Sequence, residues 1–180
     1  MSLLSYFDLV GLIKQGVVTA SLDNVNASSI DITLGGTIMV EKRGRNNIVD
    51  LANRESVGME LLELDDRGYL INPDEFILAS SCETFNLPDN ISAEYKLKSS
   101  MARNGLEHLN AGWADAGWSN SKLTLELKNM TQTHRLRLRP GMKIGQMVFF
   151  KHAPVPDHAS YAVKGRYNNQ ASVTASKGVL

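Results

Sequence analysis

The first sixteen residues carry the pattern of a short amphipathic helix. Leu9 and Leu12 are three residues apart, a spacing that places both side chains on one helical face. Ser5 followed by Asp8 is typical of an N-terminal capping box, with Asp in the place of Glu, and Gly16 suits a helix end. The pattern therefore predicts one helix between these signals.

Beyond Gly16 the hydrophobic pattern changes to short runs rich in β-branched and other apolar residues. Clusters containing Gly, Pro, Asn or Asp separate these runs, as turns do. The expected strands cover 29–34, 37–40, 69–71, 76–79, 122–127 and 145–150, and 100–103 is expected to form a helical turn. Many short strands joined by turns predict a mainly β, antiparallel barrel or sandwich with few helical turns.

The C-terminal segment follows neither pattern. From about residue 162 it is rich in Gly, Asn and Ser, which is typical of a chain end outside the core. We therefore expect a single domain over 1–180, in which 162–180 form a mobile arm.

The charge distribution changes the picture of possible ligands. The 180 residues carry 19 Lys and Arg and 19 Asp and Glu, so the formal net charge is zero. Residues 1–94 hold 6 basic and 15 acidic side chains (−9), residues 95–133 hold 5 and 3 (+2), and residues 134–180 hold 8 and 1 (+7). A neutral chain with a basic end does not suit coating a nucleic-acid polymer, but it suits a small anion.

Cysteine content and the terminus indicate the compartment. Cys82 is the only cysteine, so the chain has no internal disulfide and no cysteine-based zinc site. No apolar run reaches the roughly 18–20 residues that a membrane-spanning helix needs. The N-terminus lacks the basic region of a signal peptide and carries Asp8. We expect a cytoplasmic protein that binds no membrane.

The common catalytic motifs are missing from the sequence. It contains no P-loop, no G-x-S-x-G and no H-E-x-x-H. The four histidines have no close metal-ligand spacing: His108, His134, His152 and His158. A zinc-dependent nucleobase deaminase needs a P-C-x-x-C motif, which one cysteine does not supply. We therefore expect no metal-hydroxide chemistry on protein ligands.

Three polar features remain as candidates for chemistry. Residues 98–103 (KSSMAR) place two hydroxyls between two cations, and they either grip phosphate oxygens or form a solvated loop. The carboxylate of Asp115 either caps its own turn or contacts a substrate. Glu126 faces away from Leu125 and Leu127, and is either exposed or held in a barrel mouth as a proton shuttle.

Six blocks, taken in order, resemble a known family. They are ASSIDITLG (27–35), LPD with KSSMARNGL (87–89, 98–106), DAGWS (115–119), TLEL (124–127), RPGMKIGQ (139–146) and GRYNNQ (165–170). Together they resemble the dCTP deaminases, which share a fold with the trimeric dUTP pyrophosphatases. The resemblance covers nearly the whole chain.

The resemblance implies a fold, an activity and an assembly. The implied fold is a distorted, jelly-roll-like antiparallel barrel of the dUTPase type. The implied reaction is zinc-independent hydrolytic deamination of a deoxycytidine nucleotide: dCTP to dUTP and ammonia, or the same change in dCMP or a 5-substituted dCTP. Family members are homotrimers with active sites between subunits, the C-terminal arm closes over the ligand, and Mg²⁺ is bound through the nucleotide phosphates.

Matching positions carry the family's site residues onto this chain. The resemblance implies that Glu126 shuttles protons and that the attacking water is held by Ser99, Arg103 and the backbone carbonyl of Ala111. The implied phosphate-binding residues are Lys98, Ser100, Arg166 and Gln170, with Tyr161 beside the sugar-phosphate. Asp115 would bind the 3′-hydroxyl, and the backbone around Thr124 and Leu125 would read the base edge.

The chain departs from the family pattern near the expected pocket. Leu97-Lys98 replaces a Gly-Arg pair, Arg166 replaces a Lys, and residues 112–116 (GWADA) replace H-R-x-D-P. The loss of an Arg and the gain of Gly112 and Trp113 lead to the hypothesis that substrate choice has moved, toward another phosphate count or a 5-substituted cytosine. Trp113 itself either lines the pocket or contacts another subunit.

Two rival functions stay open on the sequence alone. One is pyrophosphate release from dUTP, alone or coupled to deamination, with which Asp115 is compatible. The other is a nucleotide-binding trimer that has lost catalysis through the changes at Lys98, Gly112 and Trp113. Glu126 favours deamination over the first rival, and the retention of Ser99, Arg103 and Glu126 argues against the second.

Overall fold

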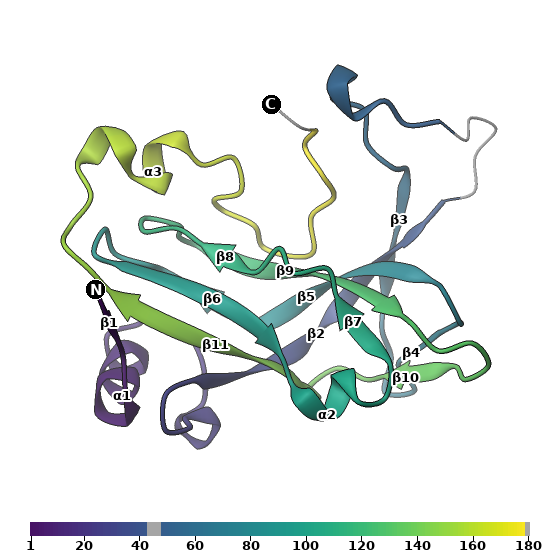
Figure 1. Ribbon diagram of the computed structural model, residues 1–180, viewed down its shortest axis with the longest axis horizontal. Helices are drawn as coiled ribbons and strands as arrows, with labels where there is room; N and C mark the ends of the chain where they lie inside the picture. Colours follow the sequence, from purple (N-terminus) through teal and green to yellow (C-terminus); the bar gives the residue numbers. More distant parts are fainter. Residues whose placement is uncertain (43–47, 179–180) are drawn as a thin grey trace.

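A curled antiparallel sheet forms the body of the protein (Figure 1). The computed structural model describes residues 1–42 and 48–178. In this part of the chain nine strands form one sheet, with the order β7-β9-β5-β2-β11-β6-β8, while β1 pairs with β11 and β3 pairs with β2. Strands β4 and β10 form a separate two-stranded sheet. The sheet closes only partway, as a half-barrel.

The elements have the following bounds. The strands are β1 Ser2–Leu3, β2 Ile30–Glu41, β3 Met59–Glu63, β4 Tyr69–Ile71, β5 Phe76–Phe85, β6 Ile91–Leu97, β7 Leu106–His108, β8 Trp113–Ala114, β9 Ser121–Asn129, β10 Leu136–Leu138 and β11 Lys143–Lys151. The helical segments are α1 Tyr6–Lys14, η1 Leu22–Asn24, η2 Leu51–Asn53, α2 Ser99–Ala102, η3 Asp157–Ala159 and α3 Tyr161–Lys164. The predicted mainly β antiparallel fold, with a short N-terminal helix and few helical turns, is confirmed.

Helix α1 begins and ends where the sequence predicts. The backbone N–H of Ser5 donates to the Asp8 carboxylate at 3.1 Å, which satisfies a donor at the start of the helix. Leu9 and Leu12 are buried against the sheet. Gly16 follows with φ of 73°, a left-handed conformation in which glycine is unstrained.

The two runs predicted at 29–34 and 37–40 form one strand. Gly35 and Gly36 make an irregularity inside β2 rather than a turn, and the pairing register with β5 shifts there. A Cβ at Gly35 would lie 2.4 Å from the Ser80 hydroxyl and 3.0 Å from the Ser80 carbonyl. Glycine is therefore needed for the close approach of two backbones, and not for chain reversal.

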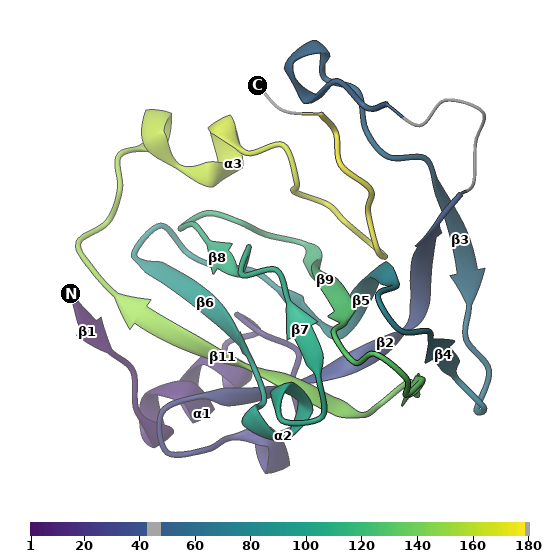
Figure 2. The same cartoon turned by 45° about the vertical axis from the view of Figure 1, so that its right-hand side comes forward.

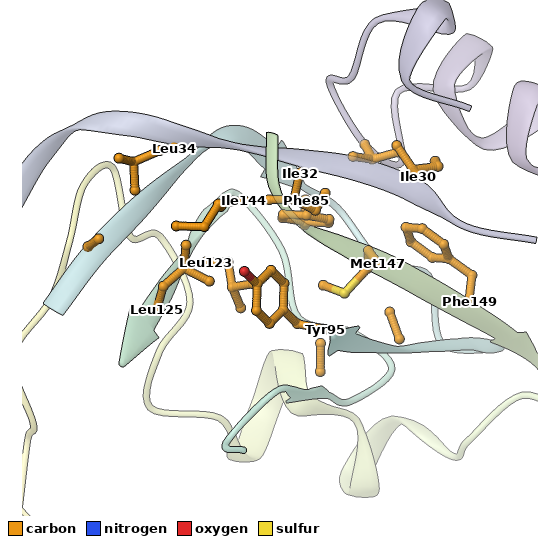
Figure 3. Close-up of a cluster of buried hydrophobic side chains, with 14 of the residues drawn as sticks. Ile30, Ile32, Leu34, Phe85, Tyr95, Leu123, Leu125, Ile144, Met147 and Phe149 are labelled. Atoms are coloured by element: carbon orange, nitrogen blue, oxygen red, sulfur yellow. The ribbon is translucent and has the colours of Figure 1, made fainter. Parts of the chain in front are cut away.

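The core lies inside the curl of the sheet (Figure 3). Strands β2 and β9 each turn alternate apolar side chains inward, as the period of two requires. Fully buried members of this cluster include Ile30, Ile32, Leu34, Leu125, Ile144, Met147 and Phe149. Tyr95 reaches into the same cluster from β6, with its hydroxyl directed toward Leu123 and Leu125.

The C-terminal arm lies over β9 (Figures 1 and 2). Residues 165–178 contain no helix or strand, yet the backbone N–H of Lys122 donates to the Gln170 carbonyl at 2.8 Å. The Trp118 indole donates to the Tyr167 carbonyl at 2.8 Å, and the Thr174 N–H donates to the Thr124 hydroxyl at 3.2 Å. Part of the predicted arm, 179–180, lies outside the described residues, and the mobility of the arm stays a prediction.

Within the described residues, no helix has both the length and the apolar character needed to cross a membrane.

Candidate functional site

A cavity of about 490 Å³ lies beside β9, next to the C-terminal arm. Its polar lining residues include Asp115, Thr124, Glu126, Tyr161 and Gln170, and Ala111 and Trp113 also line it. Its apolar lining residues include Leu51, Val57, Met59, Phe76 and Leu78. A concave, partly apolar site with a few polar groups is the usual form of a small-molecule site.

Glu126 faces this cavity because of the alternation along β9. Leu125 and Leu127 are fully buried on the core face, so Glu126 is on the other face. The Glu126 side chain is 26% exposed, but its Oε2 atom is buried and makes no hydrogen bond in the described part of the chain. Of the two readings that the sequence allows, the structure matches the carboxylate at a cavity mouth rather than the solvent-exposed strand position.

His108 lies behind Glu126. Strand β7 pairs with β9 so that His108 is opposite Leu127, and the Leu109 N–H donates to the Glu126 carbonyl at 3.1 Å. The side chain of His108 is 5% exposed, and its Nε2 lies 3.3 Å from Glu126 Oε2 without hydrogen-bond geometry. The spacing of the histidines along the chain tests His108 only as a metal ligand. Its position two residues after buried Leu106, on an alternating strand, is the signal that could have placed it in the interior.

Tyr95 extends this buried polar group. Its ring centroid lies 4.7 Å from that of His108, and its hydroxyl is buried without a hydrogen-bond partner in the described residues. Burial, and then the nearby Glu126 carboxylate, raise the pKa of Tyr95, so the phenol stays neutral. Three buried polar atoms on Tyr95, His108 and Glu126 therefore lack a protein hydrogen bond.

Asp115 is held by a neighbouring indole. The Trp113 Nε1–H donates to Asp115 Oδ1 at 2.8 Å, and the Trp113 ring stacks on Phe150 with centroids 6.0 Å apart. Gly112 allows β8 to approach β6, because a Cβ there would lie 2.6 Å from the Tyr95 carbonyl oxygen. The structure thus places Trp113 at the cavity, which is one of the two positions left open by the sequence.

The arm and the residue just before it, Tyr161, supply three of the expected binding residues. Tyr161 lines the cavity, and burial raises the pKa of its phenol. Gln170 is 8% exposed, lines the cavity, and has an Oε1 without a partner in the described residues. The Arg166 guanidinium donates to the Gly178 carbonyl at 2.8 Å and to the Lys177 carbonyl, so the expected phosphate ligand is engaged by the end of its own arm.

The four expected residues around α2 lie outside this cavity. Helix α2 is at the edge of the sheet away from α3 and the arm in both views (Figures 1 and 2), and Lys98, Ser99, Ser100 and Arg103 do not line the cavity. Lys98 Nζ donates to Asp31 Oδ1 at 2.6 Å. Burial alone would raise the pKa of Asp31, but hydrogen bonds, led by that from Lys98, lower it overall.

Within one chain the structure therefore brings together only part of the predicted site. Ala111, Asp115, Thr124, Glu126, Tyr161 and Gln170 line one cavity. The side chain of Leu125 is fully buried in the core, and Leu125 does not line the cavity. The α2 residues and Arg166 are not part of the cavity wall.

Metal ligands are not gathered in the described chain. In residues 1–42 and 48–178, no three His, Cys, Asp or Glu side chains form a group that could hold a metal ion.

Comparison with known proteins assigns the chain to a family. A family model described as dCTP deaminase-like matches residues 4–152. A protein of Persephonella marina named "dCTP deaminase, dUMP-forming" is 35% identical over 154 residues, which cover 85% of this chain and 82% of the relative. A protein of the same name from Methanospirillum hungatei is 38% identical over 156 residues, with 85% and 82% covered.

A solved structure supports the fold. The crystal structure of 2′-deoxycytidine 5′-triphosphate deaminase from Agrobacterium tumefaciens is similar with a TM-score of 0.64 and 21% identity. The match covers 82% of this chain, which spans only about half, 47%, of that longer chain. The family match extends from α1 to β11 and includes the cavity strand β9 with Glu126. The chain therefore belongs to the dCTP deaminase-like family.

Proposed function

We propose that the protein hydrolyses the exocyclic amine of deoxycytidine triphosphate, giving deoxyuridine triphosphate and ammonia without zinc. The observation that carries this proposal is the Glu126 carboxylate, which faces the cavity with Oε2 buried and not hydrogen-bonded within the described chain. A carboxylate in that setting can accept and return protons at a reacting atom, which is what general acid–base catalysis requires.

Glu126 has the proton-transfer role in each step. It takes a proton from water as the hydroxide oxygen bonds to C4 of cytosine, and the electron pair of the C4–N3 double bond moves to N3. That proton is delivered to N3. Glu126 then takes the proton of the new C4 hydroxyl and gives it to the amine, so the C4–N bond breaks, ammonia leaves and C4 becomes a carbonyl.

The other site residues bind and orient the substrate in this proposal. Asp115 accepts a hydrogen bond from the 3′-hydroxyl, Tyr161 and Gln170 line the sugar-phosphate side, and the backbone at Thr124 and Leu125 reads the base edge. The apolar wall around Leu78 keeps bulk water from the base. Mg²⁺ enters as part of the nucleotide complex, bound to phosphate oxygens.

A second copy of the chain completes the site in this proposal. Ser99 and Arg103, which would hold the attacking water with the Ala111 carbonyl, lie on α2 outside the cavity of their own chain. Lys98 and Arg166 supply the phosphate-binding charge, and the Ser100 hydroxyl donates a hydrogen bond to a phosphate oxygen. A homotrimer that places α2 of one subunit at the Glu126 cavity of the next satisfies this requirement, because a head-to-tail interface closes into a ring.

Product analysis tests the proposal. Purified protein with Mg²⁺ is incubated with dCMP, dCDP, dCTP or 5-methyl-dCTP, and ammonia and nucleotides are quantified by enzymatic assay and chromatography. We expect ammonia from dCTP and a loss of at least about 100-fold in E126Q, the scale of general acid–base catalysis. The control E107Q changes an exposed glutamate on β7 and should keep full activity.

The outcomes separate the alternatives. Binding of dCTP without ammonia release would support a non-catalytic nucleotide-binding protein, and ammonia release unaffected by E126Q would refute the mechanism. A preference for 5-methyl-dCTP or for dCMP would support the hypothesis that residues 112–116 have changed substrate choice. A clear preference for unmodified dCTP would contradict that hypothesis.

The relatives favour a second candidate, in which deamination is coupled to pyrophosphate release. The two relatives above are each named as forming dUMP. In that case a second water attacks the α-phosphorus, the bond to the bridging oxygen breaks, and pyrophosphate leaves. The same chromatography distinguishes the candidates, because coupled chemistry yields dUMP and pyrophosphate in equal amounts with the ammonia and no accumulating dUTP.

A further inference from the structure

Trp113 and Asp115 form a pair at the cavity wall. They are two residues apart on an extended segment, so their side chains lie on the same face. The indole N–H donates to Asp115 Oδ1 at 2.8 Å, and both residues line the cavity. The indole N–H can only donate, so Asp115 must accept through a carboxylate oxygen. This hydrogen bond occupies one of the two oxygens of Asp115.

The indole is itself held in place. It stacks on Phe150 of β11 with an interplanar angle of 28°, and its backbone pairs with Glu94 of β6. Trp113 is nevertheless 54% exposed, which is unusual for a large aromatic side chain and leaves much of the ring facing outward. The stacking fixes the direction in which the N–H points.

Asp115 lacks comparable support from other side chains. It is exposed, and no other side-chain hydrogen bond reaches its carboxylate within residues 1–42 and 48–178. An exposed carboxylate on a turn would otherwise sample several rotamers, and ordering it on substrate binding would cost conformational entropy. The hydrogen bond from Trp113 orders the Asp115 side chain before substrate binds. It leaves Oδ2 free to accept a hydrogen bond from a ligand.

We propose that Trp113 is a positioning residue that acts through Asp115 to make the protein select nucleotides with a 3′-hydroxyl. The inference rests on the proposed function, in which Asp115 accepts from the sugar. A site that bonds a hydroxyl favours the substrate that carries it over the analogue that lacks it, because the analogue does not make that charge-assisted hydrogen bond. Trp113 increases that preference by holding the acceptor where the hydroxyl arrives.

Sugar analogues provide the test. Ammonia release is measured with dCTP and with 2′,3′-dideoxycytidine triphosphate for the unmodified protein, W113F, W113R and D115A. We expect the unmodified protein to favour dCTP by about 10- to 100-fold in kcat/KM, the range for a hydrogen bond to a charged group. In D115A the ratio should fall close to one.

The Trp113 variants separate positioning from packing. W113F retains an aromatic ring against Phe150 but has no N–H, so we expect kcat/KM for dCTP to fall about fivefold while that for the dideoxy analogue changes by less than about twofold. W113R again offers N–H donors and should regain most of the discrimination. In a D115A background, W113F should not change the ratio of kcat/KM between the two substrates any further, because the two residues act as one unit.

Three results would overturn the inference. The first is an equal loss of kcat/KM for both substrates in W113F, which indicates packing or subunit contact. The second is an unchanged ratio of kcat/KM between the substrates in W113F. The third is a further change of that ratio by W113F in the D115A background. If the unmodified protein releases no ammonia, the proposed function fails separately. Dissociation constants of the two nucleotides are then measured by calorimetry for the same variants. Their ratio replaces the ratio of kcat/KM in each comparison and tests the inference.

Discussion

At the scale of single residues, burial distinguishes the roles of similar side chains. Glu126 and Glu107 lie on neighbouring strands, but Glu107 is exposed whereas Glu126 presents a buried oxygen to a cavity. His108 comes within 3.3 Å of that oxygen, and no other described side-chain pair places an imidazole beside a carboxylate at ion-pair distance. The imidazole is therefore in a position to set the orientation of the carboxylate.

Substitution of His108 should affect turnover more than substrate binding. We expect H108L to lower kcat for dCTP by roughly 10- to 100-fold, the cost of slightly misplacing a catalytic group. KM should stay within about threefold, since His108 does not line the cavity. H108Q carries a donor near the place of Nε2 and should recover part of the rate. Steady-state kinetics measures both parameters, with thermal unfolding of each variant as the control. Equal losses in H108L and H108Q would show that His108 acts only by filling space.

At the scale of elements, close approach of backbones shapes the site. Strand β8 contains only two residues, and it reaches β6 because Gly112 has no side chain to oppose the Tyr95 backbone. The carbonyl of Gly112 accepts from the Tyr95 N–H at 2.8 Å, which continues the pairing of the two strands. Trp113 and Asp115 are carried to the cavity by that pairing.

Replacing Gly112 should therefore disturb both stability and the site. A Cβ would lie 2.6 Å from a backbone oxygen that has little freedom to move, so we expect G112A to lose about 1–3 kcal/mol of unfolding free energy, the usual cost of overpacking. G36A is the matched control, because a Cβ on Gly36 of β2 meets nothing within 4 Å. Chemical denaturation of both variants measures the difference. If G112A were as stable as G36A, the proposed contact between β8 and β6 would not limit this position.

At the scale of the whole molecule, one chain holds an incomplete set of the expected site residues. The residues expected to shuttle protons and bind the sugar surround one cavity, and the residues expected to hold the water lie on α2 outside it. The arm lies over β9 of its own chain, next to that cavity (Figure 2). The proposed assembly, with α2 from a second copy at the cavity, would unite these residues in one site.

Mixed assemblies test this arrangement. E126Q and R103A should each be inactive alone, because each removes a different half of every shared site. Co-expressed in equal amounts, they should regain about a quarter of the unmodified activity, since random mixing in a cyclic oligomer joins an intact Glu126 to an intact Arg103 at one site in four. Ammonia assays on the whole co-expressed preparation, without separation of the pure and mixed oligomers, give the answer. No recovery, with mixed oligomers shown by mass spectrometry, would place both residues in the same subunit's site.

Local patterns in the sequence were enough to predict α1, α2 and five of the eleven strands in the described residues: β2, β4, β5, β9 and β11. They did not predict β1, β3, β6, β7, β8 and β10. The capping box of α1, the helical turn at α2 and the alternation along β9 depend on neighbours three or fewer residues away, so they are visible without the fold. The same patterns also divided one strand into two. Gly35-Gly36 has the composition of a turn, but it is an irregularity within β2, because the distant Ser80 backbone needs the space.

The site shows the same division. The sequence by itself determined that Glu126 turns away from the core. It also determined that six blocks of the chain resemble a deaminase family, since both features depend on residue order alone. Only the tertiary structure decided that His108 and Tyr95 lie behind that carboxylate, that Trp113 bonds Asp115, and that Lys98 is paired with Asp31. Those contacts form when strand pairing and curling of the sheet bring separate segments within a few ångströms, and no spacing along the chain records that distance.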